Sequence, residues 1–254
     1  PEKEKVQSLA EYAMSLGKRA GAAVTCRVND ATPAVFFSHS PARRNYEDIA
    51  AQMAESGIYF LSGGGIKHWK NRMDGRDITA EIQKMGYSFA STKEELMAVK
   101  EGPVVALMAN SDLPHALDRG DILPSSVSKA LEILDNENGF FLMVEGSMID
   151  DGGHDNKAGQ TMEEIFDFDR TIGLVLEWAA QDGETLVVVT GDHATGGMTL
   201  LGGSIEEKSI KVNFSTKGHN GIFLPVYAWG PHSEDFVGVY ENAGLSQKIR
   251  NLIR

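Results

Sequence analysis

Short apolar runs alternate with amphipathic segments along this chain of 254 residues. Three of the runs are apolar at nearly every position and lack the apolar–polar alternation of a half-exposed strand: 103–108 (PVVALM), 140–145 (FFLMVE) and 185–190 (TLVVVT). Runs of this kind suit strands that are covered on both faces, as in a parallel sheet. Shorter runs predict further strands at 20–26, 58–61 and 223–229.

Apolar residues spaced at about 3.6 positions predict helices between these strands. The predicted helices are 5–17, one starting at Pro33, 46–56, 125–136, 160–181 and 244–253, and a Gly-rich loop is predicted at 62–65. Strands and helices that alternate in this way predict an α/β fold, a three-layer sandwich with a mostly parallel central sheet. In such folds the functional residues gather at the carboxyl ends of the strands.

The net charge of −12 narrows the choice of partners. Nucleic acid is excluded as an expected partner, because its phosphates require clustered Lys and Arg. Small phosphate esters would also be repelled unless bound cations reversed the local charge, so a phosphate site here needs a metal. The single cysteine, Cys26, permits no intrachain disulfide and lies in an apolar run, which favours a buried position.

We find no apolar run of the roughly 18 residues that a membrane span needs. The opening PEKEK has no apolar core behind it and is not a signal peptide. A cytosolic protein and an exporting segment outside this sequence both remain open.

The first group of chemically active residues directly follows the strand at 140–145. Glu145, Asp150, Asp151 and His154 place three carboxylates and an imidazole in a Gly-containing loop. Asp and His four residues apart on a flexible loop can converge on one zinc-sized ion. A solvated acidic loop is the alternative.

The second group, Asp192 and His193, ends the strand at 185–190. A charged pair at the end of a buried strand is costly unless it is paired or binds a metal. A purely structural Asp–His hydrogen bond is the alternative. His219 has Gly218 before it and Gly221 after it; by itself it is a turn residue, and it gains meaning only as a third partner of these groups.

The third group follows the strand at 20–26. Thr32 before Pro33 is typical of a helix N-cap followed by a first-turn proline, and Asp30 adds favourable charge at that helix start. Downstream, Arg43 could hold a phosphoryl group through two parallel hydrogen bonds, or be a solvated charge.

Taken together, these motifs resemble the alkaline phosphatase family, in the family's order and over nearly the whole chain. The motifs are DATPA (30–34), Arg43, LSGGG (61–65), VEGSMID…H (144–154), TGDHATGG (190–197), GHNG (218–221) and WGPH (229–232). The resemblance implies two zinc sites, one magnesium site and hydrolysis of small phosphate monoesters. It implies that the first zinc is bound by Asp150, His154 and His219, the second by Asp192 and His193, and magnesium by Thr32 and Glu145.

The resemblance also implies that Arg43 clamps the phosphate, while Asp30 and Asp151 act on magnesium and phosphate through water. Asp151 stands where family members often have Lys, His or Trp. Two family elements are absent: a first strand ending in a metal-bridging Asp, and the Asp-Ser-Ala segment with the nucleophilic serine. We therefore expect residues 1–254 to form a single alkaline-phosphatase-like domain that is N-terminally incomplete. We expect the missing part to exist either as a separate N-terminal fragment or as residues outside this sequence.

The family further implies a homodimer and a periplasmic or extracellular location. The expected function is metal-dependent hydrolysis of phosphate monoesters, with this chain supplying most of the metal ligands and Arg43. Two alternatives remain open. One is a phosphodiesterase or phosphomutase of the same superfamily, and the other is a catalytically inactive fragment that binds metal or phosphate.

Overall fold

A computed structural model describes residues 4–253 and divides into two compact units. Unit 1 contains the described residues up to Pro114, Asp118–Glu145 and the residues from Ile249 onward, and unit 2 contains His115–Leu117 and Gly146–Lys248. The single incomplete domain that we expect from the sequence stays a prediction.

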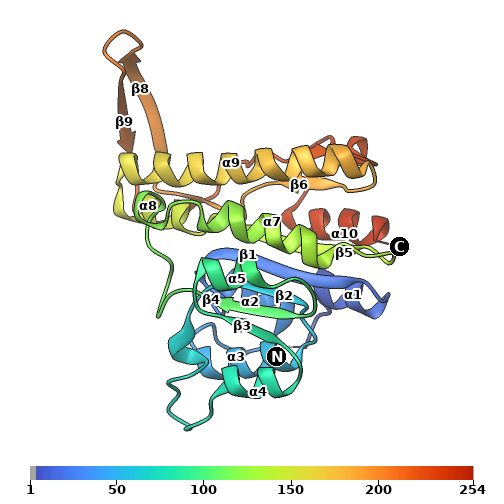
Figure 1. Ribbon diagram of the computed structural model, residues 1–254. Helices are drawn as coiled ribbons and strands as arrows, with labels where there is room; N and C mark the ends of the chain where they lie inside the picture. The colour runs from blue at the N-terminus through green and yellow to red at the C-terminus, as the bar shows by residue number, and fades with distance from the viewer. Residues whose placement is uncertain (1–3, 254) are drawn as a thin grey trace. The chain divides into compact units, whose positions relative to one another are not determined.

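The described part of unit 1 contains a five-stranded sheet in which every pair of neighbouring strands is parallel (Figure 1). The strands are β1 (Arg19–Arg27), β2 (Phe60–Gly64), β3 (Ser88–Ala90), β4 (Val104–Leu107) and β5 (Phe140–Glu145), in the order β3-β4-β2-β1-β5. This arrangement confirms the predicted α/β fold with a mostly parallel central sheet.

Helices cover both faces of this sheet, because the chain changes direction across it. The helices are α1 (Leu9–Ser15), α2 (Ala31–Phe37), α3 (Tyr46–Glu55), α4 (Ile78–Lys84), α5 (Lys93–Ala98) and α7 (Ile122–Leu134), with the short η1 (Ile66–His68). The short α6 (Ala116–Arg119) contains residues of both units. The chain moves outward from β1 through β2 to β3 and then back through β4 to β5. Since such crossovers are right-handed, α3 and α4 lie on one face and α5 and α7 on the other, as Figure 1 shows.

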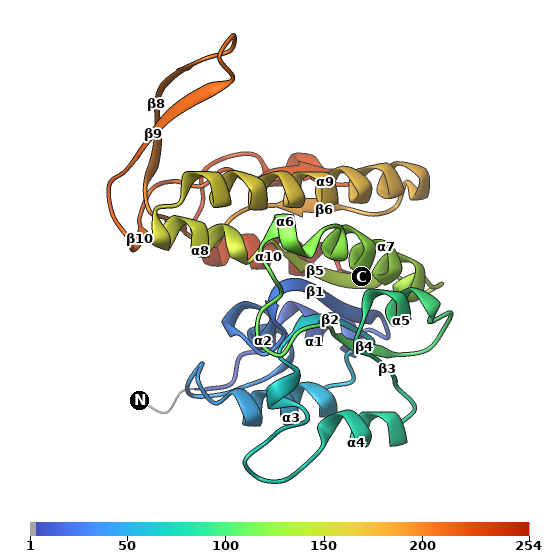
Figure 2. The ribbon, with the colours of Figure 1, turned by 60° about the vertical axis from the view of Figure 1, so that its left-hand side comes forward.

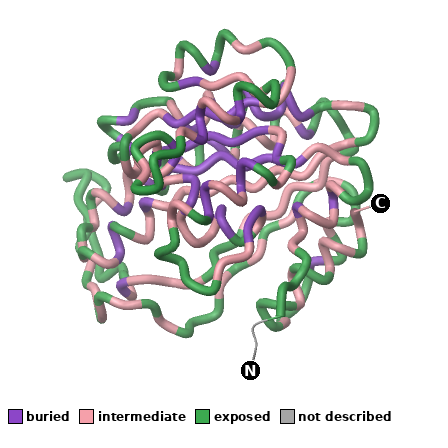
Figure 3. The backbone as a smooth tube through the Cα atoms, turned by 90° about the horizontal axis from the view of Figure 1, so that it is seen from below, coloured by how far each residue is buried: buried purple, intermediate pink, exposed green. Residues whose placement is uncertain are grey.

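The sequence of β1 explains its central place. Its small residues are fully or almost fully buried, and Figure 3 shows buried segments gathered in this sheet and its covering helices. Gly21 is required by packing, since a Cβ there would lie 2.9 Å from atoms of both Phe60 and Leu134. Burial of such apolar surface is the main favourable term in folding.

Side-chain caps fix where the first helices begin. Ser8 and Glu11 form a reciprocal capping box on α1. In α2 the N-cap is Asp30, whose carboxylate accepts a hydrogen bond from the backbone N–H of Ala31 at 2.8 Å. The prediction of Thr32 as N-cap was wrong: Thr32 and Pro33 lie inside the first turn, because Asp30 caps two residues earlier.

Unit 2 is built on two consecutive helices, α8 (Met148–Asp155) and α9 (Ala158–Asp182). Three small antiparallel pairs accompany them: β6 (Val187–Val189) with β11 (Tyr227–Trp229), β7 (Ala194–Thr195) with β10 (His219–Asn220), and β8 (Met198–Ser204) with β9 (Ser209–Phe214). Figures 1 and 2 show the β8–β9 hairpin projecting away from α9. The short η2 (Ser233–Phe236) and α10 (Asn242–Leu252) follow.

Two predicted loops are wrong in a way that matters for function. The stretch that contains Asp150 and His154 is the helix α8 rather than a flexible loop. The predicted Gly-rich loop at 62–65 is largely strand, since β2 continues to Gly64. In both places glycine permits close packing, which local composition does not distinguish from a loop.

Among residues 4–253, no helix combines the length and the apolar character that crossing a membrane requires.

The loop before α4 gives a prediction about pH. The Arg72 side chain is 3% exposed and donates to the Asp74 carboxylate at 2.5 Å and to the Glu47 carbonyl at 2.6 Å. The hydrogen bond from Arg72, followed by that from the Arg76 backbone, lowers the pKa of Asp74 from 3.8 to about 2. A lowered pKa means that this carboxylate stabilises the fold above pH 3.8 and loses that effect as the pH falls toward 2.

We therefore expect Asp74→Asn to lower the urea midpoint of unfolding at pH 6. The gap between this variant and the wild type should narrow when both are measured at pH 3. If the urea midpoints of Asp74→Asn and the wild type differed equally at pH 6 and pH 3, the ion pair of Asp74 with Arg72 would be contradicted.

Candidate metal centre

Helix α8 places two of the candidate ligands one turn apart on the same side. Asp150 and His154 are four residues apart, and the Nε2 atom of His154 lies 3.3 Å from Oδ2 of Asp150. The other ring nitrogen of His154 lies 2.5 Å from the carbonyl oxygen of Lys217. A backbone carbonyl in this position fixes the ring and directs Nε2 toward Asp150.

Two glycines let α8 approach β7 closely. A Cβ on Gly153 would lie 2.9 Å from the carbonyl oxygen of Thr195, and a Cβ on Gly196 would lie 2.5 Å from the carbonyl oxygen of Gly153. Side chains at either position would push the two segments apart. The glycines in the sequence motifs therefore serve the approach of backbone to backbone.

The strand pair β7–β10 brings in the remaining imidazoles. His219 is opposite Thr195 in the register of this pair. The His219 Nε2 atom lies 3.2 Å from Nε2 of His154 and 3.7 Å from Oδ1 of Asp150. The His193 ring stacks on that of His219, with centroids 3.5 Å apart, and its Nδ1 atom lies 3.8 Å from Oδ1 of Asp150.

Asp150 is the centre of this arrangement. One ligand atom from each of Asp150, His193 and His219 lies within 4.8 Å of the other two. Imidazole nitrogens and a carboxylate oxygen are the donor set that zinc prefers, and their convergence on one point suits a shared cation. The side chains are 37% exposed at Asp150 and 47% at His219, so that an ion from solution could reach them.

Asp192 lies beside this group rather than in it. Its carboxylate is 66% exposed and lies 3.2 Å from Nε2 of His193. The Asp192 carbonyl accepts a hydrogen bond from Asn242 at 3.4 Å. Asp151 lies on the exposed side of α8.

The remaining predicted residues belong to unit 1, at the carboxyl ends of its strands. Glu145 ends β5, and its Oε2 atom lies 3.6 Å from Sγ of Cys26. Thr32 lies in the first turn of α2. Asp30 Oδ1 accepts a hydrogen bond from Arg43 at 3.0 Å, and the Arg43 side chain is 63% exposed.

Several residues that contact the candidate ligands or Asp30 were not identified as such in the sequence analysis. The Thr195 hydroxyl donates to Asp150 and lies 3.2 Å from Nδ1 of His193. Its place two residues after His193, where a strand turns alternate side chains to one face, was a usable signal. The Lys217 carbonyl and the pair of Arg27 with Asp112 left no signal, since their partners are 63 and 85 residues away.

Comparisons with known proteins point to one family. The sequence model of a family described as "Alkaline phosphatase" matches residues 1–210. Alkaline phosphatase 4 of Bacillus subtilis (strain 168) is 39% identical over 207 residues, which make up 78% of this chain and 44% of that protein. The repressible alkaline phosphatase of Saccharomyces cerevisiae is 31% identical, with 97% of this chain and 50% of that protein covered.

Solved structures give the same result. The alkaline phosphatase from the Antarctic bacterium TAB5 matches with a TM-score of 0.91 and 36% identity, over 96% of this chain and 75% of that one. A variant of the TAB5 enzyme, described with bound magnesium, matches with a TM-score of 0.90 and 35% identity over 98% of this chain and 75% of that one. The chain spans half or less of the length of the Bacillus and yeast relatives.

Proposed function

Because this chain belongs to the alkaline phosphatase family, we propose that it supplies the metal ligands and the phosphate-binding arginine of a metal-dependent phosphate-monoester hydrolase. The convergence of Asp150, His193 and His219 carries this proposal. Family membership alone is compatible with an inactive relative, whereas a retained cluster of zinc-type donors supports retained metal chemistry.

In this proposal the first zinc is held by Asp150, His154 and His219 and the second by Asp192 and His193. The support is that Asp150 contacts His154 and His219, and Asp192 contacts His193, each within 3.7 Å. Thr32 and Glu145 would hold magnesium, as oxygen donors suit that ion. When bound, such ions stabilise the charges of the attacking and leaving oxygens in phosphoryl transfer.

The residues of this chain have separate tasks in that reaction. Arg43 would hold two phosphoryl oxygens through parallel hydrogen bonds, since its exposed guanidinium is accessible to an anion from solution. Asp30 orients Arg43 through their hydrogen bond. Thr195 orients Asp150 and His193, because its hydroxyl contacts both. Asp151 would act on magnesium and phosphate through water.

The test is the hydrolysis of an aryl phosphate monoester and of the matching diester by the purified protein after zinc and magnesium are added. We expect turnover of the monoester to exceed that of the diester by at least about tenfold, since a monoester has three non-bridging oxygens, two for Arg43 and a third for the metal ions, whereas a diester has only two. Removal of the metals by a chelator should abolish turnover of the monoester. Faster turnover of the diester would favour a phosphodiesterase.

A second candidate is a fragment that binds metal or phosphate without turnover. The observation that favours this candidate is that the chain spans only 44% of the length of the Bacillus relative and 50% of the length of the yeast relative. A nucleophilic serine and the missing carboxylates would then come from a separate N-terminal fragment. Bound zinc without turnover in a preparation whose intact mass shows this chain alone would support the second candidate.

The edge of the sheet in unit 1 supports such a fragment. β5 is the last strand in the order, and its residues are half-buried, whereas those of its neighbour β1 are almost all buried. An apolar strand with one open edge readily accepts another strand. We propose that an N-terminal segment pairs with β5 and completes one domain with residues 1–254.

The homodimer and the periplasmic or extracellular location are proposals that rest on the family alone. Sedimentation of the purified protein tests the first. Fractionation of the producing cells tests the second.

A further inference from the structure

Four charged side chains of alternating sign form a line at the carboxyl edge of the sheet in unit 1. In spatial order they are Asp112, Arg27, Asp30 and Arg43. Each neighbouring pair is joined by a contact of 3.0 Å. The line ends on Arg43, the residue that the proposed function places on the phosphate.

Arg27 is fixed more firmly than the other members. It ends β1, and its backbone N–H donates to Oδ1 of Asp112 at 2.8 Å. Its Nη1 atom donates to the two oxygens of the same carboxylate at 3.2 and 3.0 Å. Asp112 thus holds both the backbone and the side chain of Arg27, and such paired hydrogen bonds define an orientation.

Aromatic packing restricts the same guanidinium from a second side. The Arg27 guanidinium carbon lies 4.8 Å from the centroid of the Tyr46 ring, and the Tyr46 ring lies 4.8 Å from that of His68. Burial alone would lower the pKa of Arg27, but the carboxylates of Asp30 and Asp112 raise it. The guanidinium therefore stays charged in a half-buried position.

Asp30 divides its two oxygens between the two arginines. Oδ2 accepts from Arg27 at 3.0 Å, and Oδ1 accepts from Arg43 at 3.0 Å and from the Ala31 backbone at 2.8 Å. The Asp30 side chain is 19% exposed, whereas that of Arg43 is 63% exposed. Arg43 is therefore the more exposed member of this pair, and its hydrogen bond to Asp30 limits where its guanidinium can lie.

We propose that Arg27 is a positioning residue that sets the geometry and the charge of the phosphate-binding Arg43 through Asp30. The inference rests on the proposed function, because it assigns Arg27 a part in the phosphate site. Arg27 touches no substrate in this scheme. Its effect on Arg43 passes through the carboxylate of Asp30.

Geometry and charge act in the same direction. Without Arg27, the Oδ2 atom of Asp30 loses its partner, and the carboxylate can rotate and take Arg43 with it. Without Arg27, the negative charge of Asp30 is also less compensated and repels a phosphate dianion. Both effects weaken phosphate binding.

The experiment measures the dissociation constant of inorganic phosphate, and KM and kcat for an aryl phosphate monoester. It uses the purified protein loaded with zinc and magnesium. We expect Arg27→Met to weaken phosphate binding about tenfold and to raise KM more than it lowers kcat. Arg27→Lys should lie between Arg27→Met and the wild type, because lysine keeps the charge but not the planar fork.

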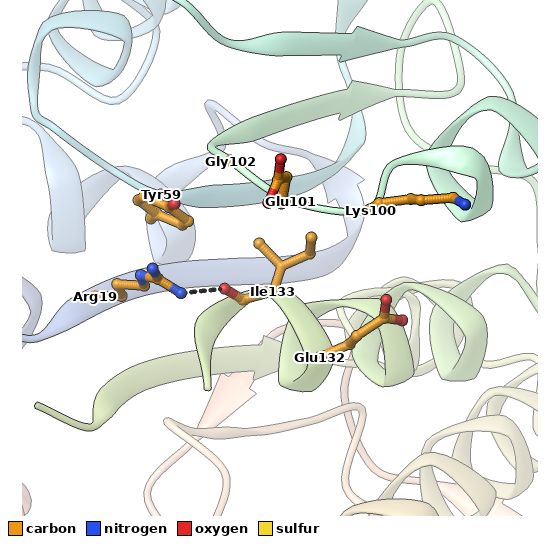
Figure 4. Close-up of a pocket in the computed structure, with 7 residues that line it drawn as sticks. All are labelled: Arg19, Tyr59, Lys100, Glu101, Gly102, Glu132 and Ile133. Carbon is orange, nitrogen blue, oxygen red and sulfur yellow. Dashed lines mark hydrogen bonds between the residues drawn. The ribbon is translucent and has the colours of Figure 1, made fainter. Parts of the chain in front are cut away.

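Arg19 provides the matched control at the other end of the same strand. It stacks on Tyr59 at 4.4 Å and donates to the carbonyl oxygen of Ile133 at 2.8 Å (Figure 4). It also donates to the carbonyl oxygen of Asp135 at 3.2 Å. Arg19→Met thus removes a similar set of contacts from β1. We expect it to lower stability like Arg27→Met but to leave the affinity for phosphate unchanged.

A double-mutant cycle tests whether the effect passes through Arg43. In a protein that already carries Arg43→Met, adding Arg27→Met should weaken phosphate binding by less than about threefold, because only the uncompensated charge of Asp30 then acts on the phosphate. Full additivity would overturn the proposal. So would equal phosphate affinities of Arg27→Met and the wild type.

The two possible failures are distinguishable. If the wild-type protein neither binds phosphate nor hydrolyses the monoester, the proposed function fails and this inference with it. If the wild type does both and the Arg27 variants match the Arg19 control, the inference alone fails. A crystal structure of Arg27→Met that keeps the Asp30–Arg43 pair in place would also overturn it.

Discussion

Replacing Asp150 with alanine is expected to weaken zinc binding by at least about 100-fold and, under the proposed function, to abolish phosphatase activity. Asp150 contacts the imidazoles of His154, His193 and His219 at 3.3, 3.8 and 3.7 Å. Its removal would leave neutral imidazoles around a divalent ion, without the negative charge that offsets it. Zinc content after gel filtration and competition with a chromophoric chelator measure the loss.

Asp155→Ala is the matched control for this experiment. Asp155 lies on the same helix, and its carboxylate pairs with Lys157 at 2.7 Å instead of with the imidazoles. This variant should bind zinc like the wild type. An Asp150→Ala protein with wild-type zinc content and affinity would show that the cluster is not the metal centre.

Four of the five strands of unit 1 could be predicted from their apolar runs, whereas the three-residue strand β3 was missed. The run at 140–145 coincides with β5, and 103–108 contains β4. Such strands are read from apolar composition alone, since the sheet is covered on both faces. The β8–β9 hairpin was missed for the opposite reason: Leu200 and Leu201 are 68% and 66% exposed, so no buried face imposes a pattern on it.

Glycine explains the errors in local structure near the site. Gly152 and Gly153 made the segment of α8 look like a loop, yet both are buried in a helix. A Cβ on Gly152 would lie 2.5 Å from the hydroxyl oxygen of Thr161, and so this helix needs glycine to pack. The need arises from a contact with another element, which the local sequence does not contain.

The candidate site was predictable to the extent that its residues come in short motifs. Asp150 with His154 and Asp192 with His193 are visible as pairs, and each pair is in contact in the structure. The contact of His193 with Asp150 joins the two motifs and depends on how the chain folds. The sequence therefore indicates the donors, whereas only the fold shows that Asp150 is their common partner.

Gly64→Ala is expected to destabilise the protein by about 3 kcal/mol, the largest stability effect that we predict. A Cβ on Gly64 would lie 1.9 Å from the carbonyl oxygen of Ser111, which is backbone and cannot rotate away. The segment after β4 would have to move, and Asp112 would move with it. Arg27, whose backbone N–H donates to Asp112 at 2.8 Å, would then lose part of its support.

Urea unfolding monitored by circular dichroism measures this change, with Gly173→Ala as the matched control. Gly173 lies inside α9, and a Cβ there would meet nothing within 4 Å. Alanine at that position should stabilise the protein by about 0.5–1 kcal/mol, because glycine is a poor helix former. The same substitution is therefore expected to change the free energy of unfolding in opposite directions at these two glycines, because the surroundings of each Cβ differ. If Gly64→Ala left the unfolding midpoint unchanged or raised it, the close packing of β2 against the segment after β4 would be refuted.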